Sequence, residues 1–291
     1  MMLPSGDLPL RRIHYDRVEE DWSVELNKIL SDVIPYLKPY LRRSLHPRQM
    51  DFETAVVEML SLLFGYQSRV FEQAYYRKQT KGRRARDDPA FCLCQIGFLA
   101  VAMLAFGISL RARRLFTYIY LFSVRSFYLN SFIYFYFQAA IGAHWFFGGI
   151  LVATVHTLLA NRHLTAAASN HENEHSVEWL YAFDIHCNAF FLYFTIAYVG
   201  HFFFLPLVLA HSFFAMLLAN VIHTTAFASY FYLTYLGFRA LPFLHDTEHF
   251  LWPVLLAIFF FVFSILFGLF FGIKLNASVL AIDILIAPLT Y

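Results

Sequence analysis

The chain has 291 residues, of which 59% are hydrophobic, 20% are aromatic and only 14% are charged. An ordinary soluble domain is about 45–50% apolar and about 25% charged, so this composition excludes a soluble globular enzyme and a disordered chain. The formal net charge of only +2 gives no reason to expect nucleic acid as the main partner.

The charged residues are concentrated in the N-terminal part of the chain. Residues 1–89 contain 15 of the 22 Lys and Arg residues and 13 of the 20 Asp and Glu residues. We therefore expect a cytosolic N-terminal segment at 1–89, a transmembrane domain at 90–273 and a short apolar lumenal tail at 274–291. Residues 1–20 lack the apolar core of a secretory signal, so the first span is expected to direct membrane insertion.

Two amphipathic helices are predicted within the N-terminal segment. The first begins near Phe52 and ends at Gly65, and the second runs from Ser68 to about Lys81. The pattern of the first predicts an apolar face and an opposite polar face, formed by Phe52, Val56, Met59 and Leu63 and by Thr54, Glu58 and Ser61. Two such helices bury little surface, so they should dock on the membrane, on the spans or on another protein. Upstream of residue 40, four prolines predict weak order.

Five segments without Asp, Glu, Lys or Arg are long enough to cross a bilayer, which takes about 20 helical residues. They lie roughly at 90–110, 131–160, 188–207, 213–235 and 250–273, with a tight turn at 206–212. The sequence therefore predicts an all-α polytopic membrane protein with about five transmembrane helices. The aromatic stretch 116–129 contains Arg125 and is either a sixth span or an interfacial or lumenal loop. The loop is favoured because burying the arginine would cost at least about 2.5 kcal/mol.

Six basic residues immediately before the first span predict a cytosolic N-terminus by the positive-inside rule. They are Arg77, Lys78, Lys81, Arg83, Arg84 and Arg86. With five spans, the C-terminus is expected to be lumenal. The glycosylation sequon Asn276-Ala277-Ser278 falls on that side, but we expect it to be unused because it lies almost at the membrane.

The three cysteines, Cys92, Cys94 and Cys187, are too few for a disulfide framework or for the four ligands of a structural zinc. Buried, inert thiols are the favoured interpretation. Acylation of the pair Cys92 and Cys94 is the alternative.

The spacing of two histidine pairs resembles that of metal ligands. Two pairs of histidines stand four residues apart with carboxylates between them, namely His171 with His175 and His245 with His249. We interpret them as solvated side chains, and we expect no metal and no cofactor. No Ser-His-Asp set, phosphate loop or pair of catalytic carboxylates can be placed, so we also expect no enzymatic activity.

Several longer motifs resemble a known family. They are Arg-Gln-Met-Asp-Phe-Glu at 48–53, Tyr-Arg-Lys-Gln-Thr-Lys at 76–81, Ala-Arg-Asp-Asp-Pro-Ala-Phe at 85–91, Val-Glu-Trp at 177–179, Tyr-Ala-Phe-Asp at 181–184 with His186 and Asn-Ala-Phe at 188–190, Leu-Gly at 236–237, and Ala-Leu-Pro-Phe-Leu at 240–244. In this order they resemble the Unc-fifty (uncoordinated-fifty) family of eukaryotic Golgi membrane proteins, from about Arg48 to Phe243.

The resemblance implies a five-span protein of the Golgi membrane, with the endoplasmic reticulum and the inner nuclear membrane as further locations. It implies that the protein assists the transport of membrane-protein cargo to the cell surface. The yeast relative interacts with a guanine-nucleotide exchange factor for Arf GTPases, so such a factor is the cytosolic partner that the resemblance implies.

In the five-span topology the motifs share the cytosolic side, and we expect them to form a partner-binding surface. Its candidate residues are Arg48, Asp51, Phe52, Glu53, Arg77, Lys78, Lys81, Arg86, Glu178, Trp179, Asp184, His186, Leu241 and Pro242. Plainer interpretations stay open: the basic residues as topology determinants that contact membrane lipid, Trp179 as an interface anchor, and Asp184 with Asn188 as a cap of the third span. RNA binding by residues 77–86 is not expected, because no RNA-binding fold accompanies them.

The expected function is therefore Golgi trafficking and cell-surface delivery of membrane proteins, by recruitment of an Arf exchange factor. The alternative is a membrane transporter or channel with intramembrane histidines. In that case His201 and His223, on adjacent helices, would meet as a proton-sensitive pair.

Overall fold

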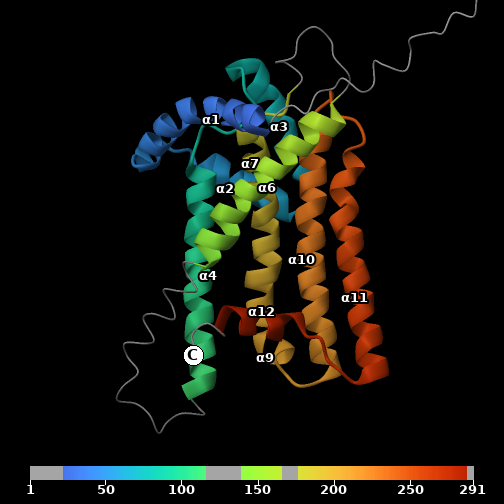
Figure 1. Cartoon of the computed structure of the whole chain (residues 1–291). Helices are drawn as coiled ribbons and strands as arrows, with labels where there is room; N and C mark the ends of the chain where they lie inside the picture. Colours follow the sequence, from blue (N-terminus) through green and yellow to red (C-terminus); the bar gives the residue numbers. More distant parts are fainter. Residues whose placement is uncertain (1–21, 116–138, 166–175, 287–291) are drawn as a thin grey trace, which may run out of the picture.

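The computed structural model describes residues 22–115, 139–165 and 176–286, which are almost entirely helical (Figure 1). Apart from an isolated antiparallel bridge between Thr165 and Leu244, no strand pairing occurs in these residues. Three helices precede the apolar part of the chain: α1 (Trp22–Ser44), α2 (Phe52–Leu63) and α3 (Gln67–Lys81), with the short turn η1 (Pro47–Gln49) between the first two.

The apolar part continues the helical architecture. Its elements are α4 (Ala90–Leu115), η2 (Ala139–Phe147), α6 (Gly148–Leu159), η3 (Ala160–Leu164), α7 (Trp179–Phe194), η4 (Thr195–Gly200), α8 (His201–Phe203), α9 (Leu205–Val208), α10 (Phe213–Arg239), η5 (Thr247–Leu251), α11 (Trp252–Phe271) and α12 (Ala277–Ile286). Upright α4, α7, α10 and α11 form the body of the molecule, whereas α1 and α12 lie crosswise near its two ends (Figure 1).

Three continuous helices are long and apolar enough to cross a membrane: Trp179–Phe203, Phe213–Arg239 and Thr247–Phe271. The prediction of an all-helical membrane protein is confirmed. The first predicted span lies within α4, whose apolar stretch Ala90–Phe106 is shorter, and the second lies partly in η2 and α6. Residues 131–138 of the second span, and all of 116–129, lie outside the described residues. The described helices therefore agree with a multi-span protein without fixing the number of spans at five.

Local chemistry explains where the predicted helices begin and end. Ser212 accepts a hydrogen bond from the backbone N–H of Ala215 at 3.0 Å and so caps α10, which begins at the predicted Phe213. Gly65 follows α2 with a φ of 88°, and Gly82 ends α3 with a φ of 74°. Both glycines adopt the left-handed conformation that commonly ends helices. The boundaries of α2 and α3 therefore agree closely with the prediction.

The prediction of weak order upstream of residue 40 is wrong from residue 22 onward, because α1 spans 23 residues and contains Pro35 and Pro39, while residues 1–21 lie outside the described residues. A proline inside a helix removes one backbone hydrogen bond and strains the preceding turn. Both prolines are exposed and, being four residues apart, share one face of the helix. The carbonyl groups that lose their partners belong to Ser31 and Pro35, both exposed residues whose carbonyls are free to bond to solvent.

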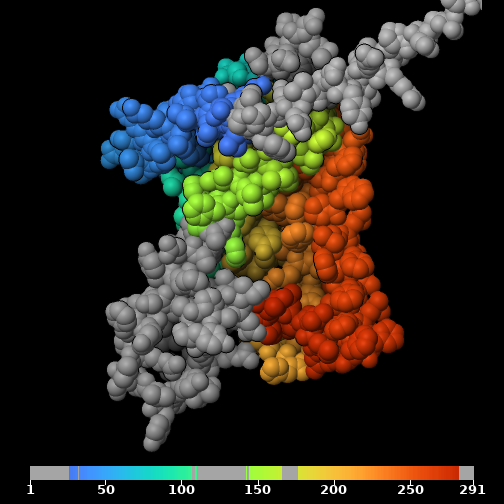
Figure 2. All heavy atoms as spheres, in the orientation of Figure 1, coloured from blue at the N-terminus to red at the C-terminus, as the bar shows by residue number. Residues whose placement is uncertain are grey.

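Helix α7 lies at the centre of the bundle and packs against α6 and α10. In the membrane-length segment Trp179–Phe203, which begins with α7, 61% of the most apolar window is buried. In the segment Thr247–Phe271, which contains α11, the buried share is only 6%, and α11 forms one outer edge of the molecule (Figure 2). Two glycines permit the close packing around α7. A Cβ atom on Gly149 would lie 2.6 Å from the His186 ring, and one on Gly237 would lie 2.7 Å from Ile185.

At the far end of the bundle, where α9 and α12 lie, neutral hydrogen bonds of two asparagines connect the elements. Asn220 Nδ2 donates to Ser264 Oγ and to the Leu275 carbonyl, each at 2.9 Å. Asn276 Nδ2 donates to the Val208 carbonyl at 2.7 Å, and Asn276 Oδ1 accepts the N–H of Ser278, in the first turn of α12. The amide nitrogen that a glycan would occupy is thus already bonded in a side chain only 9% exposed. This packing adds a second reason to expect an unused sequon.

Candidate functional site

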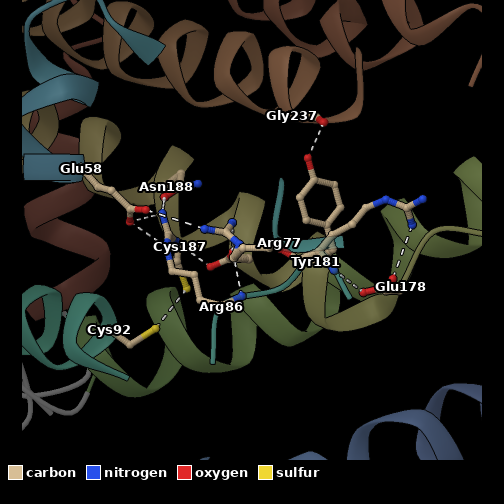
Figure 3. Close-up of polar contacts among 11 residues, drawn as sticks. Glu58, Arg77, Arg86, Cys92, Glu178, Tyr181, Cys187, Asn188 and Gly237 are labelled. Carbon is tan, nitrogen blue, oxygen red and sulfur yellow. Dashed lines mark hydrogen bonds and ion pairs between the residues drawn. The ribbon is translucent and has the colours of Figure 1, made fainter. Parts of the chain in front are cut away.

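The most prominent polar feature is a buried charged cluster that joins α2, α3 and the 82–89 segment to α7. We call it the Arg86 cluster; its members are Glu58, Arg77, Arg86, Asp184 and Asn188 (Figure 3). Arg86 donates to Asp184 Oδ1 at 2.5 Å, to Glu58 Oε2 at 2.8 Å and to Asn188 Oδ1 at 2.7 Å. The side chains of Arg86, Glu58 and Asp184 are only 8%, 4% and 9% exposed.

Arg77 completes the Arg86 cluster from α3. Its guanidinium lies 3.7 Å from Glu58 Oε1 and 3.5 Å from Asp184 Oδ2, and its Nε donates to the Arg84 carbonyl at 2.9 Å. The two acids and two bases balance in charge. Burial alone would lower the pKa of the Arg86 guanidinium, but the carboxylates of Asp184 and Glu58 raise it above its ordinary value. Arg86 is therefore a permanent cation held between two anions.

A second group centres on Glu178, the residue immediately before α7. Lys78 Nζ donates to Glu178 Oε1 at 2.9 Å, and the backbone N–H of Arg84 donates to Oε2 at 3.0 Å. The Arg84 guanidinium also lies over the Phe243 ring, 4.9 Å from its centroid. Burial lowers the pKa of Arg84, and the nearby Glu178 carboxylate opposes this shift. Glu178 thus connects α3 and the 82–89 segment to the start of α7, and Arg84 connects the same segment to Phe243 in the motif at 240–244.

A third group centres on Asp87 and brings in α1. Lys81 Nζ lies 2.9 Å from Asp87 Oδ2, Arg83 forms an ion pair with the same carboxylate, and Arg43 of α1 donates to the Asp87 carbonyl at 3.2 Å. Partial burial raises the pKa of the Asp87 carboxyl, but Lys81 and Arg83 lower it to a value below its ordinary range. The Arg83 guanidinium also stacks over the Tyr36 ring at 4.0 Å. Each of the six basic residues counted for membrane topology is therefore ion-paired within the protein.

At the same end of the molecule, two aspartates form hydrogen bonds at the starts of α2 and α4. Asp51 Oδ1 accepts the N–H of Thr54 at 2.9 Å and caps α2, and hydrogen bonds from Thr54 lower the pKa of Asp51. Asp88 accepts the N–H of Asp51 at 2.9 Å and, through its other oxygen, the N–H of Ala90 at the start of α4 at 2.9 Å. One carboxylate thus ties the start of α2 to the start of α4 by accepting a backbone N–H at each.

The family-like motif in α7 is engaged inside the bundle. The Tyr181 hydroxyl donates to the Gly237 carbonyl at 2.8 Å (Figure 3). His186 Nδ1 lies 2.8 Å from the Tyr230 hydroxyl, and its Nε2 lies 3.1 Å from the Trp145 carbonyl. These hydrogen bonds satisfy the polar side chains inside the bundle, so a buried helix can include them. α7 accordingly begins at Trp179, nine residues before the predicted start of the third span.

The candidate binding residues fall into three classes of exposure. Asp184, His186, Leu241 and the side chain of Arg86 are buried, whereas Arg77, Lys78, Glu178 and Trp179 are partly buried. The exposed candidates are Arg48, Asp51, Phe52, Glu53, Lys81 and Pro242. Only the last class has side chains that lie largely free on the surface for a partner, although Asp51 and Lys81 also have the internal contacts described above.

Two interpretations from the sequence are corrected by the geometry. Asp184 and Asn188 do not cap the third span: they lie inside α7 and bind Arg86. Glu58 was assigned to the polar face of α2, yet it is buried, while Phe52 and Val56 on the expected apolar face are exposed. A glutamate on the inward side of a short helix is a signal for a buried basic partner, and the six basic residues nearby supply candidates.

Among the described residues, the predicted histidine and cysteine pairs form no metal site. His245 and His249 are exposed, and His171 and His175 lie outside the described residues. Within the described part of the chain, no group of three or more His, Cys, Asp or Glu side chains is arranged to hold a metal ion. Cys92 Sγ and Cys187 Sγ lie 3.7 Å apart, so Cys92 faces α7, and Cys94 is partly exposed.

Comparison with known proteins decides the family. The family model described as the UNC-50 family matches residues 40–280. The chain belongs to the UNC-50 family. Two curated relatives named "Protein unc-50 homolog" are 38% identical in Dictyostelium discoideum and 37% identical in Danio rerio, and each alignment covers 79% of this chain and 82% of the relative.

Further relatives carry the UNC-50 name in other animals. "Protein unc-50" of Caenorhabditis elegans is 36% identical over 78% of this chain and 68% of its own length. No solved structure matches the chain. The UNC-50 names describe no enzyme, and the Arg86 cluster, which lies within the matched region, is part of this family member's fold.

Proposed function

We propose that this UNC-50 protein resides in the Golgi membrane and assists the delivery of membrane proteins to the cell surface. In this proposal it recruits an Arf guanine-nucleotide exchange factor to the end of the bundle that carries α1, α2 and α3, and this end faces the cytosol. The membership of the UNC-50 family supports the proposal, because the resemblance recognised in the sequence implies this role.

The observation that carries the proposal is the outer face of α2. Phe52, Val56 and Leu60 recur on one side of the helix and are 40%, 45% and 46% exposed. The opposite side is fixed to the bundle through Glu58, which binds Arg86 and Arg77. An apolar face held on a rigid support loses little conformational entropy when a partner binds, and its attachment to a membrane raises the effective concentration of that partner.

The test places a charge on this face without disturbing its support. We expect the double variant Phe52→Asp/Leu60→Asp to reach the Golgi normally but to recruit the exchange factor at least about tenfold less well, because each carboxylate must be desolvated on binding. The measurement is the amount of exchange factor on Golgi membranes in cells whose own copy has been removed. Gln73→Asp, an exposed change on α3, is the matched control.

Wild-type recruitment and cargo delivery by the double variant would refute the proposal. Trp179→Ala is a less specific test of the same surface. The indole N–H of Trp179 donates to Thr154 Oγ1 at 2.9 Å, and its ring stacks on Phe183. Loss of this side chain would therefore disturb the packing of α6 against α7 as well as any partner contact.

A second candidate function is transport through the membrane, and one contact favours it. The rings of His201 and His223 lie edge to face with centroids 5.2 Å apart, and His201 Nε2 is buried without a hydrogen-bond partner among the described residues. Such a pair suits a proton-sensitive step. Purified protein in vesicles should then conduct protons in response to a pH gradient, and His201→Phe should abolish the flux; no flux above that of empty vesicles would exclude this candidate.

A further inference from the structure

Helix α1 exposes a continuous apolar stripe that no described residue covers. Its members recur every three or four residues and are 48–78% exposed: Leu26, Leu30, Ile34, Leu37, Leu41 and, just after the helix, Leu45. At 100° per residue these side chains fall within one narrow sector of the helix. Large aliphatic side chains in such a row are normally removed from water.

The other two sides of α1 have different surroundings. Tyr36 stacks under Arg83, and Arg43 donates to the Asp87 carbonyl, so this side is attached to the bundle. On the same side, burial raises the pKa of the Tyr40 hydroxyl above its ordinary value. The third side is polar and exposed, with Lys28, Lys38 and Arg42. The apolar stripe therefore lies between an attached side and a basic, solvated side.

The orientation of α1 relates the stripe to the membrane. The three membrane-length helices share the upright direction, and α1 runs crosswise to them near the end where α4 and α7 begin (Figure 1). It also projects sideways from the bundle (Figure 2). Because the upright helices are the ones that cross the bilayer, a helix that runs crosswise to them is parallel to the bilayer surface.

We propose that α1 is an interfacial helix whose apolar stripe is embedded in the surface of the protein's own membrane, with its basic side directed to anionic lipid headgroups. An amphipathic helix with leucine on one face and lysine or arginine on the other is typical of such binding. The basic side chains extend toward the headgroups while their aliphatic parts lie along the interface.

The charge of α1 favours lipid over a protein as the cover of this stripe. α1 contains four basic residues and two acidic ones, Glu25 and Asp32. α2 also exposes an apolar row but contains no basic residue; its Glu53 is exposed, whereas its Glu58 is buried against Arg86. An anionic membrane surface therefore attracts α1 and offers no such attraction to α2. The two neighbouring helices thus present different surfaces, α1 to lipid and α2 to a protein partner.

The experiment uses the full chain in vesicles of zwitterionic and anionic phospholipid. An environment-sensitive fluorescent amino acid replaces Leu37 on the stripe or, as the matched control, Lys38 on the polar side. Nitroxides attached to lipid acyl chains should quench the probe at position 37 at least about threefold more strongly than at position 38, and aqueous iodide should show the reverse order.

Each other outcome at position 37 overturns the proposal. Quenching by iodide as strong as at position 38 would mean that the stripe faces water. Quenching by neither agent would mean that another part of the protein covers it. A separate variant tests the attraction of the basic side to anionic lipid. The triple change Lys28→Glu/Lys38→Glu/Arg42→Glu should reduce acyl-chain quenching at position 37 in anionic vesicles but not in purely zwitterionic ones. An equal reduction in the two kinds of vesicle would show that anionic headgroups do not attract the basic side of α1. None of these readouts depends on recruitment of a trafficking factor.

Discussion

The two ends of the helix bundle are fastened by different chemistry. Where α2, α3 and α7 meet, ion pairs centred on Arg86 and Glu178 join segments that are about a hundred residues apart in the chain, and the Arg86 pair with Asp184 is buried. At the far end, neutral amide and hydroxyl groups of Asn220, Ser264 and Asn276 make the connections. The same set of helices is thus joined mainly by ion pairs at one end and by neutral hydrogen bonds between buried groups at the other, where the exposed Lys274 Nζ adds a bond to the His211 carbonyl.

This difference determines how each end should respond to change. Removal of one member of a buried ion pair leaves an uncompensated charge in a medium of low polarity, which is strongly unfavourable. Removal of a neutral amide leaves unpaired dipoles, which costs less. The charged end should therefore be more sensitive to single substitutions, and its geometry should be more strictly defined.

The largest effect is expected from Arg86→Met. The change leaves the buried carboxylates of Glu58 and Asp184 without their main cation, so we expect a loss of about 3–5 kcal/mol of stability. Thermal unfolding of the purified protein in detergent measures it. Lys81→Met is the matched control, because the Lys81 side chain is 54% exposed and its pair with Asp87 should contribute at most about 1 kcal/mol. Equal effects of the two changes would mean that burial does not distinguish these pairs.

The counterpart at the far end is Asn220→Ala. It removes the bonds to Ser264 Oγ, to the Leu275 carbonyl and to the N–H of Ala277, and we expect a loss of about 2–3 kcal/mol. The same unfolding assay applies. If this variant were less stable than Arg86→Met, the comparison between the two ends would be reversed.

A smaller effect sharpens the description of the packing around α7. In Gly237→Ala the new methyl group would meet Ile185 at 2.7 Å, in the helix whose Tyr181 bonds to the Gly237 carbonyl. Overpacking of this kind should destabilise by about 1–3 kcal/mol. Gly97→Ala is the control, since nothing lies within 4 Å of that position and alanine favours a helix. If Gly237→Ala left the stability of the protein unchanged, α7 and α10 would not be in close contact at this position.

The smallest effect concerns acid. The pKa of Asp87 is lower in the folded protein than its ordinary value, so its carboxylate stabilises the fold above that ordinary value and loses this contribution as the pH falls through the lowered pKa. Asp87→Asn should therefore unfold at a lower temperature than the wild type at neutral pH, and the difference should diminish as the pH falls through the lowered pKa of Asp87. A difference that persisted in acid would assign the effect to packing.

The sequence predicted the features that depend on local chemistry. The predicted end of α2 at Gly65, the predicted second helix from Ser68 to about Lys81 and the predicted start of the fourth span at Phe213 agree with α2, α3 and α10 to within two residues. The apolar segments predicted a membrane protein because length and lack of charge suffice for that inference. The family was recognisable from motifs whose order along the chain is distinctive.

The sequence did not predict features that depend on distant contacts. The partners Arg86 and Asp184 are 98 residues apart, and no local pattern relates them. A general argument could have suggested the contact, because Asp184 lies inside an otherwise uncharged apolar stretch and needs a cation there. α1 was missed because its prolines concealed an apolar row from Leu26 to Leu41 that has helical spacing.

The central claim is that a residue of the central membrane helix holds the N-terminal helices in place, and hydrogen–deuterium exchange of Asp184→Asn tests it most directly. The substitution keeps the shape of the side chain but removes the charge that binds Arg86 and Arg77. We expect amide exchange in α2 and α3 to accelerate at least about tenfold, while α10 and α12 keep their wild-type protection. Unchanged exchange in α2 and α3 would contradict the claim.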